Sequence, residues 1–544
     1  MNGSVRTWFA GGGLVACACA PAGSQVRTSL ARVAQVRSIR VTVDPAASGA
    51  YGRHGPFTPN AVERAVAARL ERRGLRLDPA LSSAMRDVAR FAPSRHRVPA
   101  PLVEGVLARH GIPDPPPRLL VVESEADLRG ACRAGGGACD DLARTLDEAV
   151  VGLGPLSAAA VVGLGAVGRG AGARTRVVLA VLDRGVELDP FPRTVPVGSR
   201  IPLRGRLSAG RARPRIELVL PDGRVETVAA VDRGGGRFDA VVPCPARGTV
   251  QVEVLADGRY GPEVVANAPV GCGRDLSPSF VVEVERLRPG TTEAEVARAV
   301  FALLQDERRR RGLAPLSYDP ALAAVAEAHA REMARDGYVG HHSPKTGDAA
   351  SRVARSGIEA RVVRENVARG YGPREIHASL LRSPGHRANL LAEDVDRVGV
   401  GAVFGPRAGS DPDAPRPIYV AQKFIRAPLD PGRDPTKALA VALARAGRPA
   451  AAAARGDPAL SRLARRDAAA VARGRRLDAD ARDRALRAAG AEAATRIEAS
   501  APALDDLVTA GLWDAIDGPY GFAVARRPDG TFVLVVYVRR GPVP

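Results

Sequence analysis

The tetrapeptide Asp-Pro-Ala-Leu occurs three times in this 544-residue chain, at 78–81, 319–322 and 457–460. Each copy opens a segment whose apolar residues recur at helical spacing, and Asp-Pro is typical of a helix start because the carboxylate caps free amides. Each segment later reaches two strand-like stretches with glycine in the first: VVGLGAV and TRVVLAVLD, RVGVGAV and IYVAQKF, YGFAVA and TFVLVVYVR. The recurrence predicts three copies of one α+β unit.

Residues 186–285 have a different pattern. RIELVLPDGRVETVAAV and TVQVEVLADGRY alternate apolar and polar residues around Asp-Gly turns, which indicates antiparallel hairpins. We therefore expect a β-sandwich at 186–285, between α+β units at 45–185 and 290–428, with the third unit at 437–544. A capping-box pattern from Thr292 to Glu295 begins the middle unit, and the proline-rich stretches at 186–192 and 427–436 are expected linkers.

The first twenty residues resemble a bacterial lipoprotein signal peptide. Arg6 precedes a short apolar stretch that ends in Leu-Val-Ala-Cys, so Cys17 is the expected lipidation site; the alternative is a chance cysteine in an alanine-rich start. No later segment is long and apolar enough to span a bilayer. The expected location is therefore outside the cytoplasm, as a periplasmic or outer-membrane lipoprotein, or extracellular.

Besides Cys17 and Cys19, the chain has four cysteines, in two pairs that are close in the sequence. Cys132 and Cys139 lie within seven residues of each other, and Cys244 and Cys272 flank one β-rich stretch within 186–285. An even number of cysteines in an exported chain predicts two local disulfides. Neither pair has histidines at zinc-finger spacing, which argues against a metal knuckle.

The net charge of +20 raises nucleic acid as a partner, but the distribution of charge argues against it. Nearly all of the positive charge is arginine, scattered through Ala/Arg/Gly/Pro-rich sequence without aromatic residues between the basic ones. Residues 163–168 match the Gly-x-Gly-x-x-Gly pattern of dinucleotide-binding loops. Because a β-like stretch follows instead of a helix, we exclude a dinucleotide site there as well.

Histidine is scarce and clustered. Five of the eight histidines lie between positions 329 and 386, all in the middle unit. They accompany three short motifs, HHSP with His341, ENVA with Glu365 and SPGHR with His386, ahead of the glycine strand VGVG. Two imidazoles and a carboxylate from separate elements can meet in one cleft, where they form hydrogen bonds and shift each other's pKa.

These motifs, in this order, resemble the CAP superfamily in its bacterial form, the SCP domain; the superfamily contains cysteine-rich secretory proteins, antigen 5 and pathogenesis-related 1. The resemblance covers 290–428 and rests on the opening helix, DPAL, HxSP, ENVA, SPGHR, VGVG and YVAQKF. It implies an α+β fold, with a central α-β-α sandwich around a small antiparallel sheet. The units at 45–185 and 437–544 are then degenerate CAP-like units without the cleft motifs.

The resemblance also implies site residues. The family cleft holds two histidines and two acidic residues, which correspond here to His341 (His342 is the alternative), His386 and Glu365, while Ser383 stands where the second glutamate would be. Three ligands are enough for Zn²⁺ or another divalent cation if water is the fourth. Supporting residues are Asn366, expected to shape a turn, and Arg387, expected to pair with a carboxylate; His329 and His377 are expected to be packing or surface residues.

The sequence leaves two main functions open. The first is an exported, lipid-anchored envelope protein that binds a small molecule, lipid, peptide or glycan through the cleft. It is favoured because Ser383, three residues from His386 across a proline turn, is poorly placed as a nucleophile. The alternative is a hydrolase of peptide or cell-wall polymer that uses a metal ion or a general base. A purely structural envelope scaffold is a third reading.

Overall fold

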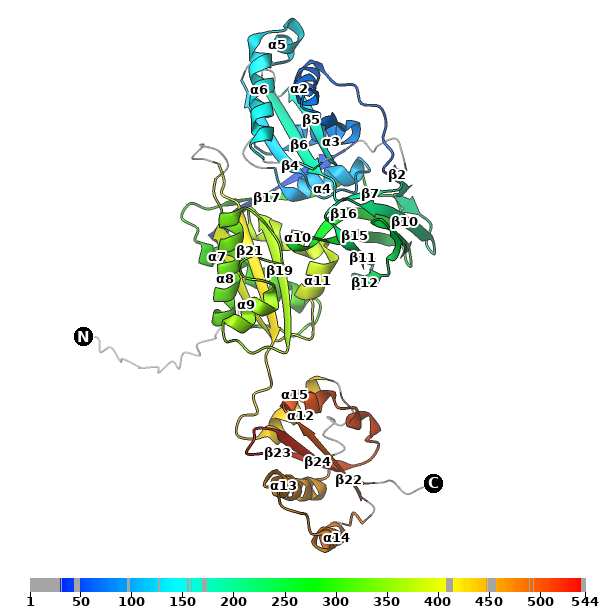
Figure 1. Ribbon diagram of the computed structural model, residues 1–544, viewed down its shortest axis with the longest axis vertical. Helices are drawn as coiled ribbons and strands as arrows, with labels where there is room; N and C mark the ends of the chain where they lie inside the picture. Colours follow the sequence, from blue (N-terminus) through cyan, green and yellow to red (C-terminus); the bar gives the residue numbers. More distant parts are fainter. Residues whose placement is uncertain are drawn as a thin grey trace, which may run out of the picture. The chain divides into compact units, whose positions relative to one another are not determined.

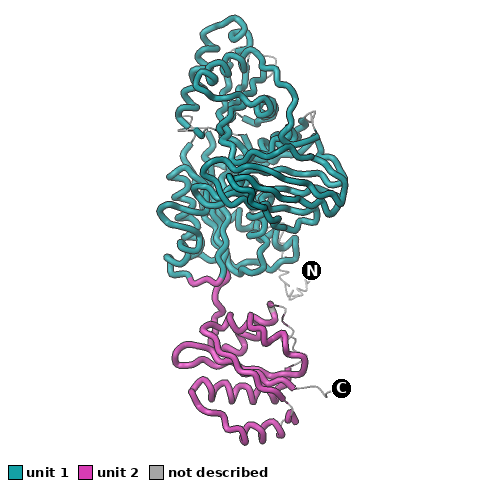
Figure 2. Tube along the Cα trace, turned by 45° about the vertical axis from the view of Figure 1, so that its right-hand side comes forward, with its two compact units in different colours: residues 1–358, 362–425 teal, residues 359–361, 426–544 magenta. Residues whose placement is uncertain are grey.

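A computed structural model describes residues 30, 32–43, 49–94, 98–125, 128–153, 156–157, 159–168, 174–407, 414–446, 448, 456–488, 490–492 and 494–539. The predicted signal peptide, with Cys17, lies outside these residues. The chain divides into two compact parts, one of residues 1–358 and 362–425 and the other of residues 359–361 and 426–544 (Figure 2). The word unit is kept below for the three α+β units. Among the described residues, no helix is long and apolar enough to cross a membrane.

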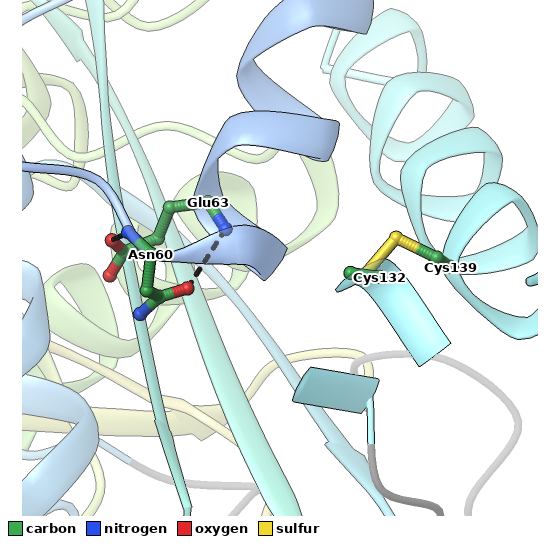
Figure 3. Close-up of a disulfide and its surroundings, with 4 residues drawn as sticks. All are labelled: Asn60, Glu63, Cys132 and Cys139. Atoms are coloured by element: carbon green, nitrogen blue, oxygen red, sulfur yellow. Dashed lines mark hydrogen bonds between the residues drawn. A yellow bond between two sulfur atoms is a disulfide. The ribbon is translucent and has the colours of Figure 1, made fainter. Parts of the chain in front are cut away.

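The first α+β unit has one four-stranded sheet with helices on it (Figure 1). Its strand order is β3-β5-β6-β4, and the helix α3 that DPAL opens packs on β5. The disulfide between Cys132 and Cys139 joins α5 to α6, and a capping box of Asn60 and Glu63 starts α2 (Figure 3). The elements are α2 (Ala61–Glu71), β3 (Arg76–Leu77), α3 (Pro79–Phe91), α4 (Ala100–Arg109), β4 (Arg118–Ser124), α5 (Leu128–Ala134), α6 (Gly137–Val151), β5 (Ala160–Gly168) and β6 (Thr175–Asp183).

The β-rich region forms two facing sheets around an apolar core. One sheet has the order β13-β14-β10-β7 and the other β12-β11-β15-β16-β9, and Cys244 and Cys272 form the second predicted disulfide. The strands are β7 (Val186–Leu188), β8 (Phe191–Pro192), β9 (Thr194–Val195), β10 (Arg200–Leu207), β11 (Ala212–Val219), β12 (Val225–Val228), β13 (Val231–Gly234), β14 (Arg237–Pro243), β15 (Gly248–Gly258) and β16 (Gly261–Cys272); β2 (Ala50–Tyr51) pairs with β8.

The middle unit is an α-β-α sandwich. Val398, Val400 and Ala402 of β20 share a core with α7, while Gly399 and Gly401, which alternate with them, approach the backbone of α8. The sheet order is β18-β20-β21-β19. The elements are α7 (Glu293–Arg310), β18 (Ser317–Tyr318), α8 (Pro320–Asp336), α9 (Ala349–Arg355), β19 (Val362–Gly370), α10 (Pro373–Arg382), α11 (Pro384–Leu390), β20 (Arg397–Phe404) and β21 (Ile418–Arg426).

The last α+β unit has a three-stranded sheet, ordered β22-β24-β23, with α13 packed on β23. Gly521 of β23 allows this contact, since a Cβ there would lie 2.2 Å from the backbone nitrogen of Ser461. The elements are α12 (Pro435–Arg445), α13 (Pro458–Ala472), α14 (Ala479–Ala488), β22 (Ala494–Ala501), α15 (Leu504–Thr509), η3 (Gly511–Ala515), β23 (Tyr520–Arg526) and β24 (Phe532–Arg539).

The three DPAL segments have the same local structure. In each, the aspartate side chain caps its helix, at Asp78, Asp319 and Asp457. The backbone N–H of the same aspartate donates to the first strand of the glycine-bearing pair, at Val162, Val398 and Tyr520, over 2.7–2.9 Å. The α+β fold class predicted from the recurrence is confirmed.

One pairing had no sequence signal. Strand β1 (Ala34–Thr42) pairs antiparallel with β17 (Ser279–Leu287), so residues before the first unit join residues just before the middle one. The Phe280 ring of β17 lies against Gly105 of α4, where a Cβ would come within 2.2 Å of the ring. The β1–β17 sheet therefore ties the first unit to the chain that enters the middle unit.

Candidate functional site

The structure brings His341, Glu365 and His386 together from three elements. His341 is in the loop after α8, Glu365 is on β19 and His386 is on α11. Nδ1 of His341 lies 3.2 Å from Oε2 of Glu365, and the ring centroids of His341 and His386 are 5.7 Å apart. The His341 side chain is 27% exposed, whereas that of Glu365 is 3% exposed, so His341 is the solvent-facing member of this pair.

Glu365 is buried among cations. Nη2 of Arg352 donates to both of its carboxylate oxygens at 3.0 Å, and Nζ of Lys423 contacts Oε1 directly. Burial opposes ionisation, but the hydrogen bond from His341 and the charges of Lys423 and Arg352 outweigh it, and they hold the pKa of Glu365 well below its usual range. Glu365 is therefore a fixed anion, and Nδ1 of His341 is the donor in their hydrogen bond.

The two other histidines of the site, half-buried His386 and buried His329, are neutral. Burial, with a smaller effect of His341, lowers the pKa of His386 to about 3. Burial also lowers the pKa of His329 to about 4; its Nε2 donates to the carbonyl oxygen of Gly340 at 3.0 Å and lies 3.7 Å from Oε1 of Glu365. His329, expected to be a packing or surface residue, is thus buried beside the acidic member of the site.

Sequence reasoning missed Arg352 and Lys423. Lys423 is fully buried on β21, and burial lowers its pKa to about 8 despite the opposing charge of Glu365. The sequence does contain a signal for Lys423, because it is one of three lysines in the chain and lies inside the apolar stretch IYVAQKFI. A lysine in such a strand needs an anionic partner, because an unpaired buried charge is costly. Arg352 offered no comparable signal.

Asn366 fixes α11 against the sheet. Its side chain is fully buried, and Nδ2 donates to the carbonyl oxygen of His386 and to Oε1 of Gln422, both at 3.1 Å. Nδ2 of Asn389, on α11, donates to Oδ1 of Asn366 at 3.0 Å and to the carbonyl oxygen of Glu365 at 2.9 Å. These bonds set the distance between His386 and Glu365.

Three of the remaining predicted residues, Ser383, His342 and Arg387, contact the β-sandwich. Oγ of Ser383 donates to Oε2 of Glu253 at 2.9 Å, and the backbone N–H of His342 donates to the carbonyl oxygen of Tyr260 at 2.9 Å. Arg387 donates to the carbonyl oxygens of Gly223 and Leu381, not to the carboxylate that was expected. His377 is buried on α10. The β-sandwich thus borders the residues of the candidate site.

The residues present do not fit a divalent cation. Within the described part of the chain, no three His, Cys, Asp or Glu side chains are placed to hold a metal ion. Both oxygens of Glu365 already accept hydrogen bonds from Arg352, and Oε1 also contacts Lys423. A cation at this carboxylate would be repelled by two positive charges at short range. The arrangement instead offers a carboxylate-oriented imidazole at the surface.

Comparison with known proteins gives a consistent result for the middle unit. The sequence model of the cysteine-rich secretory protein family (CAP) matches residues 301–424. The uncharacterized protein YkwD of Bacillus subtilis is 34% identical over 107 residues, which are 20% of this chain and 42% of YkwD. The uncharacterized membrane protein YlbC of the same organism is 35% identical over 131 residues, 24% of this chain and 37% of YlbC. The chain thus spans about two fifths of the length of these curated relatives.

Three solved structures also match. An outer surface protein of Borrelia burgdorferi is 20% identical, with a TM-score of 0.22, and the match covers 25% of this chain and 96% of that one. An extracellular SCP-domain protein of Bacillus anthracis is 18% identical, with a TM-score of 0.21, covering 45% and 86%. A cysteine-rich secretory protein of Staphylococcus aureus is 11% identical, with a TM-score of 0.20, covering 50% and 87%.

Proposed function

Residues 301–424 form a CAP domain, and from this premise we propose that the chain is an exported binding protein that takes its ligand at His341 and His386. Lipidation of Cys17 would anchor it to the envelope. The observation that carries the proposal is the hydrogen bond between His341 and Glu365, which orients a partly exposed imidazole with a buried, fixed anion. The lipoprotein-like start of the sequence supports the location.

The electrostatics of the site select the ligand chemistry. Because Nδ1 of His341 donates to Glu365, Nε2 is the ring nitrogen of His341 that is left for a ligand. His386 is neutral at pH 7, since its pKa is lowered to about 3. A neutral imidazole beside a fully paired carboxylate favours ligands with hydroxyl or amide N–H donors over cations. Glycans and peptides have such donors, and among the ligand classes considered they fit best.

The test is a calorimetric titration of the full chain with soluble N-acetylglucosamine oligomers and with a short alanine peptide. We expect the double variant His341→Ala, His386→Ala to lose the binding seen in the parent. His342→Ala is the matched control, because His342 is exposed and contacts Tyr260 through its backbone. Equal affinity in the parent and in the double variant would refute the proposed site.

A second function rests on the same pair. An imidazole oriented by a carboxylate can act as a general base, so the alternative is a hydrolase that activates water at Nε2 of His341. Ser343 and Ser383 supply no nucleophile, because each donates its hydroxyl to a glutamate, Glu332 and Glu253 respectively. The alternative predicts turnover of peptide or cell-wall polymer that is lost in Glu365→Gln. Hydrolysis no faster than in buffer, across both substrate classes, rules it out.

A further inference from the structure

A cavity of about 380 Å³ lies where the first α+β unit, the β-sandwich and the CAP domain meet, and all three belong to the same compact part of the chain. Its walls come from α4 and the loop after it, from β15–β17, and from α10 through Arg382. We propose that this cavity is a second binding site, separate from the cleft, for a small N-acylated amino acid. Its volume is within the range of about 300–1,000 Å³ that small-molecule sites occupy.

Most of the wall is apolar. It includes Leu107 and Ile112 of the first unit, Pro269 of the β-sandwich and Phe280 of β17. The Phe280 ring is held in place, with Gly105 against it and the guanidinium carbon of Arg109 4.1 Å from its centroid. A rigid apolar wall of this kind suits a branched or aromatic side chain, and it buries that side chain without ordering the protein further.

Arg382 offers a cation for an acid group. It lines the cavity, and its side chain is 37% exposed. Nε of its guanidinium donates to Glu104 at 2.9 Å, which fixes its orientation. A ligand carboxylate in the cavity would pair with this guanidinium through a charge-assisted hydrogen bond. The carboxylate end of the ligand is therefore assigned to Arg382.

The cavity also has acceptors for an amide N–H. Glu104 and Gln251 both line it. Nε2 of Gln251 is already used, because it donates to Oδ1 of Asn267, so its carbonyl oxygen is the group left for a ligand. A molecule with one carboxylate, one amide N–H and an apolar side chain matches these three features together. An N-acylated amino acid has that composition, either free or as the last residue of a peptide.

Hydrogen bonds connect the polar residues of the cavity wall to Ser383, next to the helix that carries His386. Nδ2 of Asn267 donates to Oε1 of Glu253 at 3.3 Å, and Oγ of Ser383, the residue before α11, donates to Oε2 of the same glutamate at 2.9 Å. Gln251 is thus joined through two side chains to the residue that precedes the helix carrying His386. These bonds fix the polar wall in one arrangement before any ligand binds.

The test is isothermal calorimetry on the full chain with N-acetyl-leucine, its neutral amide, and the tripeptide Ala-Ala-Leu. We expect N-acetyl-leucine to bind roughly 10- to 100-fold more tightly than its amide, which is the effect of one charge-assisted hydrogen bond. The tripeptide distinguishes the sources: tighter binding than N-acetyl-leucine supports a peptide end, and weaker binding supports a free acylated amino acid.

Two variants locate the site. Arg382→Lys keeps a cation beside Glu104 but removes the planar guanidinium, and it should lose most of the preference for the acid over the amide. Val281 lines the cavity and is 56% exposed, so Val281→Trp should block the opening and reduce binding at least 10-fold without disturbing a core. The matched controls are Arg374→Lys, on the same helix, and Val231→Trp, at an exposed position outside the cavity.

The proposal is overturned if N-acetyl-leucine gives no binding heat at about 10 mM, well above a millimolar Kd. It is also overturned if the acid and the amide bind equally, or if Val281→Trp, folded by circular dichroism, binds as the parent does. Binding here that survives the cleft variants His341→Ala and His386→Ala supports a separate site, and so the two proposals can fail independently.

Discussion

Glu253 makes the contact between the β-sandwich and the CAP domain sensitive to pH. It is 1% exposed on β15, directly opposite Glu217 of β11 in the sheet register. Burial raises its pKa to about 8, although the hydrogen bond from Ser383 lowers it, and the charges of Glu217 and Glu104 raise it further. Folded Glu253 is therefore mostly protonated at neutral pH, and the interface holds a neutral carboxylic acid.

The size of the effect on the free energy of unfolding follows from the shift in the pKa of Glu253. The pKa rises from 4.5 to about 8 on folding, and one unit corresponds to about 1.4 kcal/mol. Because the folded pKa is the higher one, the contribution of Glu253 to stability is complete below pH 4.5 and is lost as the pH rises through 8. The loss over that window is roughly 3–5 kcal/mol.

Glu253→Gln removes this loss. Glutamine keeps the size of the side chain but does not ionise; its oxygen can accept from Nδ2 of Asn267, and its nitrogen can donate to Oγ of Ser383. We expect parent and variant to differ by less than about 1 kcal/mol at pH 5, and the variant to be more stable by roughly 3–5 kcal/mol at pH 8. The measurement is urea-induced unfolding at pH 5, 6, 7 and 8, with hydrogen exchange of β15 identifying the transition that belongs to this interface.

The control is Glu226→Gln, on β12 of the same sheet, where the side chain is 41% exposed. It should reproduce the pH dependence of the parent. If the difference between Glu253→Gln and the parent changes by less than about 1 kcal/mol from pH 5 to pH 8, then Glu253 is ionised in the folded protein, and the reasoning from burial is wrong.

Three further predictions test other parts of the chain. Lys423→Met should lower the free energy of unfolding of the CAP domain by about 3–5 kcal/mol, because Glu365 stays buried with one cation fewer; an unchanged thermal melt contradicts this. Gly401→Ala should cost about 3 kcal/mol or more by the same measurement, since its Cβ would lie 2.1 Å from a backbone nitrogen of α8, whereas Gly511→Ala, in open space, should cost little. Cys17→Ser should move the expressed protein from the membrane fraction to the soluble fraction, and an unchanged distribution on a fractionation blot refutes lipid anchoring.

Local chemistry made much of the fold predictable. An aspartate before a proline can cap a helix, and in each DPAL segment the apolar residues that follow have helical spacing, so Asp78, Asp319 and Asp457 marked three helix starts without any knowledge of the sheets. Both disulfides were predictable because their cysteines are close in the sequence. The glycines of the strand pairs were visible too, although the reason for them, close approach of a helix backbone, needed the structure.

Contacts between distant segments were not predictable in the same way. The β1–β17 pairing joins residues about 240 positions apart, and no local pattern specifies the partner of an isolated strand. The same holds for Arg352, which reaches Glu365 from α9. A metal site was expected at Glu365 because its candidate ligands could be seen in the sequence, whereas the two cations that occupy its oxygens could not.

The strand register shows why the side chains of the candidate site occur in the middle unit and have no equivalent in the described parts of the other two. In each unit one glycine of the first strand lies opposite a residue of the second: Gly399 opposite Lys423, and Gly163 opposite Ala180. In the last unit Gly521 lies opposite Tyr537. These residues are equivalent, because each glycine packs against the leucine of its own DPAL segment.

A second equivalent position lies on the helix, seven residues after the leucine of each DPAL segment. It is His329 in the middle unit, where it lies beside Glu365 with Lys423. In the first unit it is Val88, which packs with Ala180 in an apolar core, and in the last it is Asp467, which accepts a hydrogen bond from Tyr537. At these two positions the first unit thus has two apolar side chains, the middle unit a neutral histidine and a lysine, and the last unit an aspartate that accepts a hydrogen bond from a tyrosine. Among the described residues of the three units, only the lysine of the middle unit contacts a carboxylate that also binds a partly exposed histidine, so the same backbone in the flanking units provides the fold without the site.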